Sequence, residues 1–468
     1  MPSLRLTPLI LAVALFMENM DSTVIATSLA EIARDIGTEP IALKLALTSY
    51  LVALAIFIPI SSWMADRFGA RNVFRWAMIV FVLGSVACAI SNSLLTFVGS
   101  RFLQGMGGAM MTPVARLVLV RVTPRNQLVD AMAWLSIPGL VGPIVGPPVG
   151  GAITTFLSWH WIFLINVPIG ILGVLLVNRF LPEWHRNAPR KMDFLGFFLA
   201  GTTFAGWVFG ISVLTLPALP AGFGYAALGI GVVTAFAYIW HYRRTEHPLL
   251  DLSMFRFPLF RVTVVAGIFF RLGVGATPFL FPLMLQLAFG MTPFESGMVT
   301  FAGAVGAFIA KFVADRILRL TGFRATLVWS TLVTAVGIFA QAMYTPETPI
   351  PLIFLILIIA GFFQSMFWTA TNAFVFADVS DKDAGQANVI SQVSVQLSLA
   401  FGVALGGGVL EAARIFTHGG GEPVLNDFHL AFWTIGAATL ISTAMFARSV
   451  PKGAGLHGNV RIEEKPAD

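Results

Sequence analysis

The chain has 468 residues, of which 57% are hydrophobic and 11% are charged. Soluble domains carry about 25% charged residues, so this composition excludes a soluble globular protein and indicates an all-α polytopic membrane protein. The formal net charge of +6 raises the question of nucleic-acid binding. The basic residues lie mostly in short loops between apolar segments, however, which favours a role in membrane orientation. We therefore expect a lipid bilayer as a partner and no nucleic acid.

Apolar segments long enough to cross about 30 Å of hydrocarbon recur along the whole chain. Fourteen spans are predicted, at residues 8–28, 44–65, 72–91, 95–120, 131–157, 160–181, 193–215, 222–242, 258–288, 294–318, 324–344, 350–377, 385–413 and 428–448. An even number of spans places both termini on the same side. No predicted loop is long enough to hold a soluble domain.

Basic residues are distributed unevenly among the predicted loops. Of the 29 basic residues, 22 fall in the two tails or in loops on the same side as the tails. The other seven are Arg34, Lys44 and Arg414 in opposite loops, and Arg101, Arg116, Arg271 and Lys311 within spans. Cytoplasmic loops carry the excess of Lys and Arg, so both termini are predicted to be cytoplasmic. Arg116 and Lys311 are expected to reach toward the cytoplasmic headgroups.

A weak internal repeat divides the chain. Similar acidic–basic turns follow the second and the tenth span, and their residues are Asp66, Arg67, Gly69 and Arg71 in one, and Asp315, Arg316, Gly322 and Arg324 in the other. Transporters are commonly built from such repeats, with substrate bound between them. We expect six-span halves at 1–182 and 258–450, two inserted spans within 183–257, and a tail at 451–468.

Two carboxyl groups, Glu18 and Asp21, lie one turn apart on the same face of the first span. A charge inside hydrocarbon costs at least about 2.5–3.5 kcal/mol, so such residues usually have a function. A carboxyl group held away from water is suited to exchanging a proton. Arg101, at a similar depth in the fourth span, is placed to pair with Asp21, and Gln104 lies one turn further on. The alternative is an inert polar contact that only holds the two helices together.

Small residues and prolines fill the fifth span. Gly142, Gly146 and Gly150 recur every four residues and form a smooth stripe for close helix approach. Pro147 interrupts the hydrogen-bond ladder of the helix, and Gly151 extends the small surface. This combination suits a helix that rocks or seals, although packing alone is the simpler interpretation.

Gln104 of the fourth span and several polar residues of the second half are candidates for a substrate cavity. Arg271 and Gln286 lie in the ninth span, and Arg271 should face either a cavity or a carboxylate. Gln364, Trp368 and Asn372 lie on one face of the twelfth span, although Trp368 taken alone suits core packing.

Other chemistry finds no support in the sequence. The single cysteine, Cys88, excludes an intrachain disulfide. No Cys/His cluster has metal-ligand spacing, no phosphate-binding loop is present, and no catalytic constellation stands out. We therefore expect no metal and no cofactor, a non-enzymatic protein, and a proton gradient as the source of energy.

Glu411, near an outer helix end, is expected to be solvated.

Several motifs appear in order on the predicted spans. They are Asp21-Ser22-Thr23-Val24-Ile25, Asp66-Arg67-x-Gly69-x-Arg71, Arg101-x-x-Gln104-Gly105-x-Gly107, Gly142-x-x-x-Gly146-Pro147-x-x-Gly150-Gly151, and Trp159-His160-Trp161 leading into Asn166-Val167-Pro168. Together they resemble the motifs of the major facilitator superfamily, in particular its fourteen-span drug:proton antiporters of the EmrB/QacA kind. The resemblance extends over about residues 8–450.

This resemblance implies a major facilitator fold with two six-helix bundles and two inserted helices, in the inner membrane of a bacterium. It also implies export of amphipathic small molecules, cationic or neutral, in exchange for protons. Asp21 and Glu18 would carry the proton and Arg101 would tune Asp21. Asp66, Arg67, Gly69, Arg71, Asp315 and Arg316 would gate the cytoplasmic side. The resemblance does not decide whether a periplasmic adaptor takes part.

Two alternatives stay open at this point. One is a proton-coupled uptake symporter for a specific solute, against which the glycine stripe of the fifth span argues. The other is a membrane receptor or scaffold that transports nothing, against which the lack of a soluble signalling module argues. The direction of solute flux under an inward proton gradient separates the first from an exporter, and substrate-dependent proton movement excludes the second.

Overall fold

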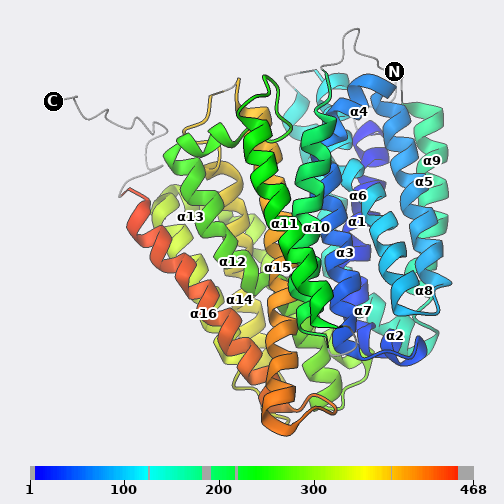
Figure 1. Ribbon diagram of the computed structural model, residues 1–468, viewed down its shortest axis with the longest axis vertical. Helices are drawn as coiled ribbons and strands as arrows, with labels where there is room; N and C mark the ends of the chain where they lie inside the picture. Colours follow the sequence, from blue (N-terminus) through cyan, green and yellow to red (C-terminus); the bar gives the residue numbers. More distant parts are fainter. Residues whose placement is uncertain (1–5, 125–126, 182–190, 217–219, 381, 452–468) are drawn as a thin grey trace.

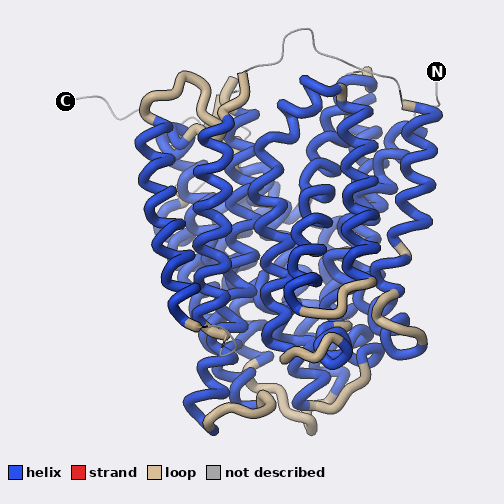
Figure 2. Tube along the Cα trace, turned by 45° about the vertical axis from the view of Figure 1, so that its right-hand side comes forward, coloured by secondary structure: helices blue, strands red, loops and turns tan. Residues whose placement is uncertain are grey.

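The computed structural model describes residues 6–124, 127–181, 191–216, 220–380 and 382–451. Within these residues every regular element is a helix (Figure 2). The predicted tail at 451–468, apart from its first residue, and the linker residues 182–190 lie outside the described part of the chain. We call residues 6–181 the first half, 258–449 the second half, and α10 with α11 the inserted pair.

The first half contains six membrane-length segments and several short helices. Its elements are α1 (Leu6–Val24), η1 (Ile25–Thr27), α2 (Leu29–Asp35), η2 (Pro40–Leu43), α3 (Lys44–Phe57), η3 (Ile58–Ile60), α4 (Ser61–Phe68), α5 (Ala70–Ala89), α6 (Leu94–Val122), α7 (Leu128–Phe156), α8 (Trp161–Leu164) and α9 (Asn166–Phe180). Elements η2 to α4 run on as one apolar span, Pro40–Phe68.

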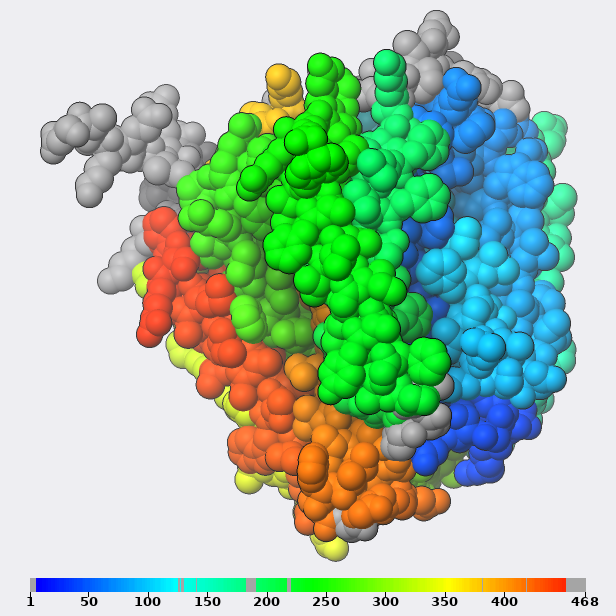
Figure 3. Space-filling model, in the orientation of Figure 1, coloured from blue at the N-terminus to red at the C-terminus, as the bar shows by residue number. Residues whose placement is uncertain are grey.

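The inserted pair and the second half complete the bundle. Their elements are α10 (Phe194–Leu214), α11 (Ala221–Tyr242), η5 (Leu252–Arg256), α12 (Pro258–Leu283), η6 (Met284–Ala288), α13 (Pro293–Gln341), α14 (Ile350–Phe374), α15 (Ala384–His418) and α16 (Leu425–Ser449). Helix α10 contacts both α3 and α15. The inserted pair therefore lies on one face of the molecule, across the seam between the two halves (Figures 1 and 3).

The number of spans agrees with the prediction of fourteen. Thirteen helices in the described residues are long and apolar enough to cross a membrane. One of them, α13, has 49 residues and contains a break at Gly322, whose φ of 75° interrupts the helical backbone. Helix α13 therefore accounts for the tenth and the eleventh span. The first and last helices both have their terminal ends at the same end of the bundle (Figure 1); we call this the terminal end, and the other the distal end.

Helix starts follow local polar chemistry. The Thr292 hydroxyl accepts a hydrogen bond from the Glu295 backbone N–H at 3.2 Å, and the Glu295 carboxylate accepts one from the Thr292 N–H at 2.8 Å. This capping box satisfies two backbone donors that the first turn of α13 leaves free. Ser93 and Thr96 form the same arrangement at the start of α6.

The internal repeat is clearer in the three-dimensional structure than in the sequence. In the first half, Arg71 donates to the backbone carbonyl of Asn178 near the end of α9. In the second half, Arg324 donates to the carbonyl of Ala447 near the end of α16. Each arginine stands two residues after a glycine with positive φ, and each ties the third span of its half to the sixth.

Close packing between the first and fifth spans is also repeated. A Cβ on Gly142 of α7 would lie 2.9 Å from the backbone nitrogen of Met20 on α1. In the second half, a Cβ on Gly402 of α15 would lie 3.1 Å from the backbone nitrogen of Ala276 on α12. Real Cβ contacts are rarely this short, so glycine sets how close these helices come. The two halves thus share one backbone scaffold.

Contacts between the halves gather at the distal end. The side chain of Gln286, in the π-helical turn η6, donates to the carbonyl of Thr27 at 2.9 Å. The backbone N–H of Phe294 donates to the Thr155 hydroxyl at 3.0 Å. Arg414 pairs with the Glu39 carboxylate at 2.9 Å. These contacts close the bundle at the distal end.

Candidate functional site

A buried ion pair lies inside the first half. The Asp21 and Arg101 residues are 2% and 1% exposed, and Arg101 Nη1 donates to Asp21 Oδ2 at 2.7 Å. The other carboxylate oxygen, Oδ1, accepts hydrogen bonds from Gln104 Nε2 and Asn166 Nδ2, both at 2.8 Å. The structure therefore joins α1, α6 and α9 through one carboxylate. The sequence pattern predicted the meeting of Asp21, Arg101 and Gln104, although Gln104 belongs to this network and not to a substrate cavity.

Other groups complete this network. Ser85 Oγ on α5 accepts from Gln104 Nε2 at 2.8 Å and from Asn166 Nδ2 at 3.2 Å. The guanidinium carbon of Arg101 lies 4.4 Å from the centre of the Tyr50 ring. The sequence placed Asn166 in a motif, but it assigned neither Asn166 nor Ser85 to the site. Asn166 is an amide within an apolar run, which is the signal that marks it.

The surroundings of the pair explain how two charges remain buried. A buried ion pair is stable only when further hydrogen bonds satisfy its remaining polar atoms. Arg101 also donates to the Gln104 side-chain oxygen, and the aromatic face of Tyr50 covers the guanidinium group. Arg101 Nε and Asn166 Oδ1 still lack partners among the described residues. Removing the charge of either Asp21 or Arg101 would leave the opposite charge uncompensated in a water-poor interior.

Glu18 lies one turn from Asp21 but does not join this network. Its Oε2 accepts a hydrogen bond from the Thr112 hydroxyl on α6 at 2.7 Å. Glu18 lines a cavity of about 730 Å³, together with Arg116 of α6 and Gln392 and other polar residues of α15. We call this the polar cavity. Glu18 is thus accessible from the cavity, whereas Asp21 is sealed. Arg116, which is exposed, lies on the wall of the polar cavity, and its reach toward the headgroups stays a prediction.

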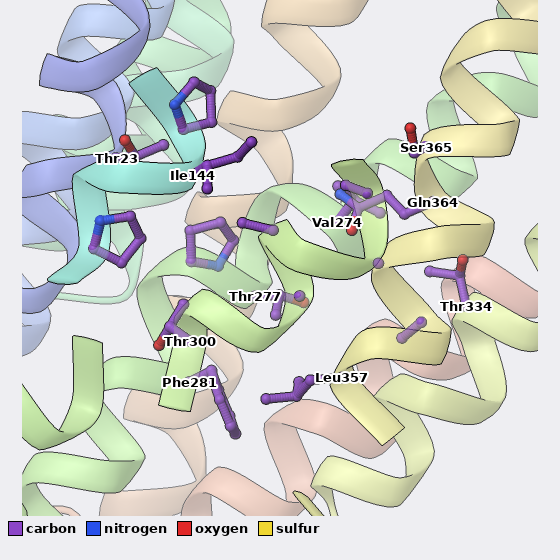
Figure 4. A pocket seen from close by; sticks show the side chains of 18 of the residues that line it. Thr23, Ile144, Val274, Thr277, Phe281, Thr300, Thr334, Leu357, Gln364 and Ser365 are labelled. Carbon is purple, nitrogen blue, oxygen red and sulfur yellow. The ribbon is translucent and has the colours of Figure 1, made fainter. Parts of the chain in front are cut away.

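A second cavity, of about 540 Å³, lies between the two halves. We call it the central cavity; Figure 4 shows Thr23 and Ile144 of the first half across it from Val274, Thr277 and Gln364 of the second. Most of its wall is apolar. The side chains come from α1, η1, α7, α12, α13 and α14 and include Pro143, Pro147, Pro278, Phe281, Thr300, Phe308, Leu357, Gln364, Ser365, Trp368 and Asn372. The structure therefore places Gln364, Trp368 and Asn372 on this wall, and their contact with substrate stays a prediction.

Lys311 of α13 lines both cavities. The two cavities therefore meet at this side chain. Lys311 Nζ donates to the Thr369 hydroxyl of α14 at 3.2 Å. Its predicted orientation toward the headgroups is wrong, because α13 turns this face toward the space between the halves.

Two predicted cavity residues lie elsewhere. Gln286 holds the halves together at the distal end, where it also donates to the Ser296 hydroxyl at 3.2 Å. Arg271 of α12 is 3% exposed and is not part of either cavity wall. Its Nε and Nη1 have no hydrogen-bond partner among the described residues, and its guanidinium carbon lies 5.4 Å from the centre of the Trp368 ring. The carboxylate partner that the sequence left open for Arg271 is absent from the described part of the chain.

The glycine stripe of α7 faces two helices. A Cβ on Gly146 would lie 2.9 Å from the Thr23 Cβ, and one on Gly150 would lie 3.0 Å from the Val24 Cα, so both glycines pack on α1. Gly151 faces the other half, where a Cβ would lie 2.8 Å from the Phe294 Cα on α13. Helix α7 therefore connects the helix that carries Asp21 with the second half.

The first acidic–basic turn is tied to its neighbours. Asp66 on α4 accepts a hydrogen bond from Arg121 Nη2 on α6 at 2.6 Å, and Gly69 has φ of 86°. Arg71 reaches α9, whereas Arg67 is exposed. Of the four gating residues predicted in this turn, Asp66 and Arg71 tie it to neighbouring helices and Gly69 supplies its backbone conformation.

The second turn differs. Asp315 pairs with Arg319 one turn along the same helix at 2.9 Å, and both side chains are 78% exposed. Arg316 is also exposed. The repeat therefore preserves the glycine and the arginine that follows it, but not the tie between the fourth span and the acidic residue.

Two predictions about distal charges are wrong. Lys44 does not lie in a solvated loop: its side chain is fully buried and donates to the Thr215 hydroxyl at the end of α10 at 2.6 Å. Glu411 is 1% exposed and pairs with Arg414 at 2.6 Å. Both lie where α3, α10 and α15 meet, a contact that the sequence pattern does not reveal.

The site as a whole defines a class of protein. A polytopic helical bundle made of two matched halves, with a cavity between them and a buried ion pair beside it, has the architecture of a membrane transporter. The described residues contain no group of His, Cys, Asp and Glu side chains arranged to hold a metal ion.

Comparison with known proteins identifies the family. The family model described as "Major Facilitator Superfamily" matches residues 11–244 and 263–466. The chain belongs to the major facilitator superfamily and is a multi-pass membrane transporter.

Named relatives cover nearly the whole chain. It is 35% identical over 405 residues to the "Probable transport protein HsrA" of Haemophilus influenzae, covering 86% of this chain and 87% of that protein. It is 33% identical over 447 residues to the "Putative multidrug resistance protein MdtD" of Cronobacter sakazakii, covering 92% and 91%. Among solved structures, a D-xylose-proton symporter aligns with a TM-score of 0.70 at 14% identity, covering 97% of this chain and 98% of that one; this likeness supports the fold alone.

Proposed function

We propose that this protein is a proton-coupled secondary transporter that exports amphipathic small molecules by alternating access. The buried Asp21–Arg101 pair beside a cavity between two halves is the observation that carries the proposal. The name of the MdtD relatives, multidrug resistance protein, supports export. We place the terminal end of the bundle in the cytoplasm, because the basic residues gather there, and the protein in the inner membrane of a bacterium.

Asp21 acts through its charge. As a carboxylate it attracts Arg101 and accepts from Gln104 and Asn166, which fixes α1 against α6 and α9. A proton on Asp21 removes the attraction and turns one acceptor into a donor. The protonated Asp21 side chain then no longer fits the donors of Arg101, Gln104 and Asn166, and α1 can move relative to α6 and α9.

The glycine stripe of α7 transmits this movement of α1 to the second half. Helix α1 packs closely on Gly146 and Gly150 of α7, and α7 packs through Gly151 on α13. A displacement of α1 therefore moves α7 against α13. Glu18, on the wall of the polar cavity, supplies or receives the proton from the cavity side. Proton binding and opening are in this way linked through one helix.

The test is flux in proteoliposomes under an imposed pH gradient. The wild-type protein is expected to move substrate against the direction of proton flow, whereas an uptake symporter would move both in the same direction. Asp21→Asn is expected to abolish coupling. Glu347→Gln, the same type of change at an exposed loop position, serves as the control. Full proton-coupled flux by the Asp21→Asn variant would contradict the proposal.

A further inference from the structure

The charges on the cavity walls carry information about substrate chemistry. Among the described residues that line the central cavity, Lys311 is the one with a charged side chain, and none is acidic. The rest of the wall is apolar or neutral and includes Phe281, Leu357 and Trp368. A site of this kind suits a ligand with an apolar body and one group that pairs with an ammonium ion.

Lys311 is available to such a group. Its one hydrogen bond among the described residues is to a neutral hydroxyl, that of Thr369. It forms no ion pair with a described residue, although the lysine lies within a membrane-spanning helix, where an unpaired charge is costly. A bound anion would compensate this charge.

Arg271 adds a second positive charge behind the wall. It lies behind Trp368, which lines the cavity, and its Nε and Nη1 have no acceptor among the described residues. Three described carboxylates of the second half are engaged elsewhere. Asp315, one turn from Lys311 on α13, pairs with Arg319, Asp378 accepts from the backbone N–H groups of Leu259 and Phe260, and Glu411 pairs with Arg414. The described wall of the central cavity therefore has a positive charge and no acidic side chain of its own.

From this arrangement we propose that the central cavity binds amphipathic molecules that bear an acidic group, such as a carboxylate or a sulfonate, with Lys311 as the counter-ion. The proposal rests on the transport function proposed above and specifies its substrate class. It departs from the cationic or neutral substrates expected from the family resemblance. Glu18 is the one carboxylate among the described residues of the polar cavity wall, where it faces two basic residues, Arg116 and Lys311, so this wall does not favour a cationic ligand either.

The test measures binding to the purified full-length protein without a pH gradient. Two fluorescent probes share one aromatic frame and differ by an acidic group: 1-anilinonaphthalene-8-sulfonate and the neutral N-phenyl-1-naphthylamine. Lys311→Gln is expected to weaken the sulfonate probe about five- to tenfold, the usual effect of losing one charge-assisted hydrogen bond, and to leave the neutral probe within about twofold.

Matched variants keep the test falsifiable. Lys311→Arg retains the charge and is expected to bind the sulfonate probe within about twofold of wild type. Arg256→Gln removes a positive charge from the second half at a site 60% exposed, and is expected to change neither probe. Equal loss of both probes in Lys311→Gln would point to damaged folding, and the charge-retaining Lys311→Arg variant then decides. Retained binding of the sulfonate probe by Lys311→Arg supports the proposal, and its loss overturns the proposal.

A second pair of probes tests the sign of the charge directly. Tetraphenylborate and tetraphenylphosphonium have the same shape and opposite charge. Tetraphenylborate is expected to displace the sulfonate probe at about tenfold lower concentration. Equal or better displacement by tetraphenylphosphonium overturns the proposal. Proton-coupled export of a cation would support the proposed transport function and refute the proposed substrate class. Lys311-dependent binding of an anion without proton-coupled flux would support the substrate class and refute the transport function.

Discussion

Asp21 on α1 and Arg271 on α12 occupy the first helix of their respective halves, and each faces the fourth. In the first half the partner is Arg101, in an ion pair with a filled hydrogen-bond network. In the second half the neighbour is Trp368, and the guanidinium group has no acid beside it in the described part of the chain. The backbone packing around the two sites is the same, since glycines on the fifth helix set its approach to the first in both. The same backbone arrangement therefore holds a paired charge, Asp21, in the first half and a charge without a described acidic partner, Arg271, in the second. In the functions proposed above, the first half handles the proton and the second half recognises the substrate.

The largest effect is expected from breaking the compensated pair. Arg101→Gln leaves the Asp21 carboxylate buried without a counter-ion, and should lower the free energy of unfolding by about 3–5 kcal/mol. The double variant Asp21→Asn/Arg101→Gln has no buried charge and should regain most of this stability while coupling stays lost. Thermal unfolding in detergent and pH-gradient flux measure the two effects. A double variant no more stable than Arg101→Gln would show that the pair is not the source of the loss.

The shared scaffold predicts equal effects in the two halves. Gly150→Ala and Gly402→Ala each bring a methyl group against a neighbouring backbone, and each should cost about 1–3 kcal/mol, the range for overpacking. A Cβ on Gly229 of α11 meets nothing within 4 Å, so Gly229→Ala should not destabilise the protein and should raise its stability by up to about 1 kcal/mol. Melting temperatures of the three variants provide the comparison. A clear difference between Gly150→Ala and Gly402→Ala would break the equivalence of the halves.

Loss of the Arg271 charge should affect stability in the opposite direction to loss of Arg101. Arg271→Met removes a buried cation that has no acidic partner among the described residues, and should leave stability unchanged or raise it by about 1 kcal/mol. Binding of the sulfonate probe should fall about two- to threefold, because the charge acts from behind Trp368. Unfolding and probe titration of the same sample test both statements. Destabilisation as large as that of Arg101→Gln would reveal a hidden partner.

The smallest effects are expected at the acidic–basic turns. Asp66→Asn removes a pair with Arg121 in which the side chains are 18% and 22% exposed, and should slow transport with a stability loss of about 1 kcal/mol or less. Asp315→Asn removes an exposed pair and should cost about 0.3–0.5 kcal/mol with little change in flux. Transport rates at saturating substrate compare the two. A greater loss of transport rate in Asp315→Asn than in Asp66→Asn would show that the second turn, and not the first, gates the cytoplasmic side.

Much of the architecture follows from the sequence because lipid imposes simple rules. Apolar length defines the spans, and the count of fourteen agrees with the structure even where α13 joins two of them. The prediction that Asp21 meets Arg101 succeeded because two opposite charges at a similar depth have few other ways to be compensated. Asn166 and Ser85 were missed because neutral polar residues are common in spans and their partners come from separate helices.

The errors share one cause. Lys44, Glu411 and Lys311 were assigned to solvent or headgroups by their distance from helix ends, but each faces another helix or a cavity. The rotation of a helix about its axis depends on its neighbours, and the neighbours here are far apart in sequence, as Lys44 and Thr215 are. Hydrophobicity along each helix therefore determined how the chain crosses a membrane, and charge at matched depth indicated the Asp21–Arg101 pair. Tertiary packing alone decided how the other charges are paired, which of them line a cavity and which have no acid beside them among the described residues.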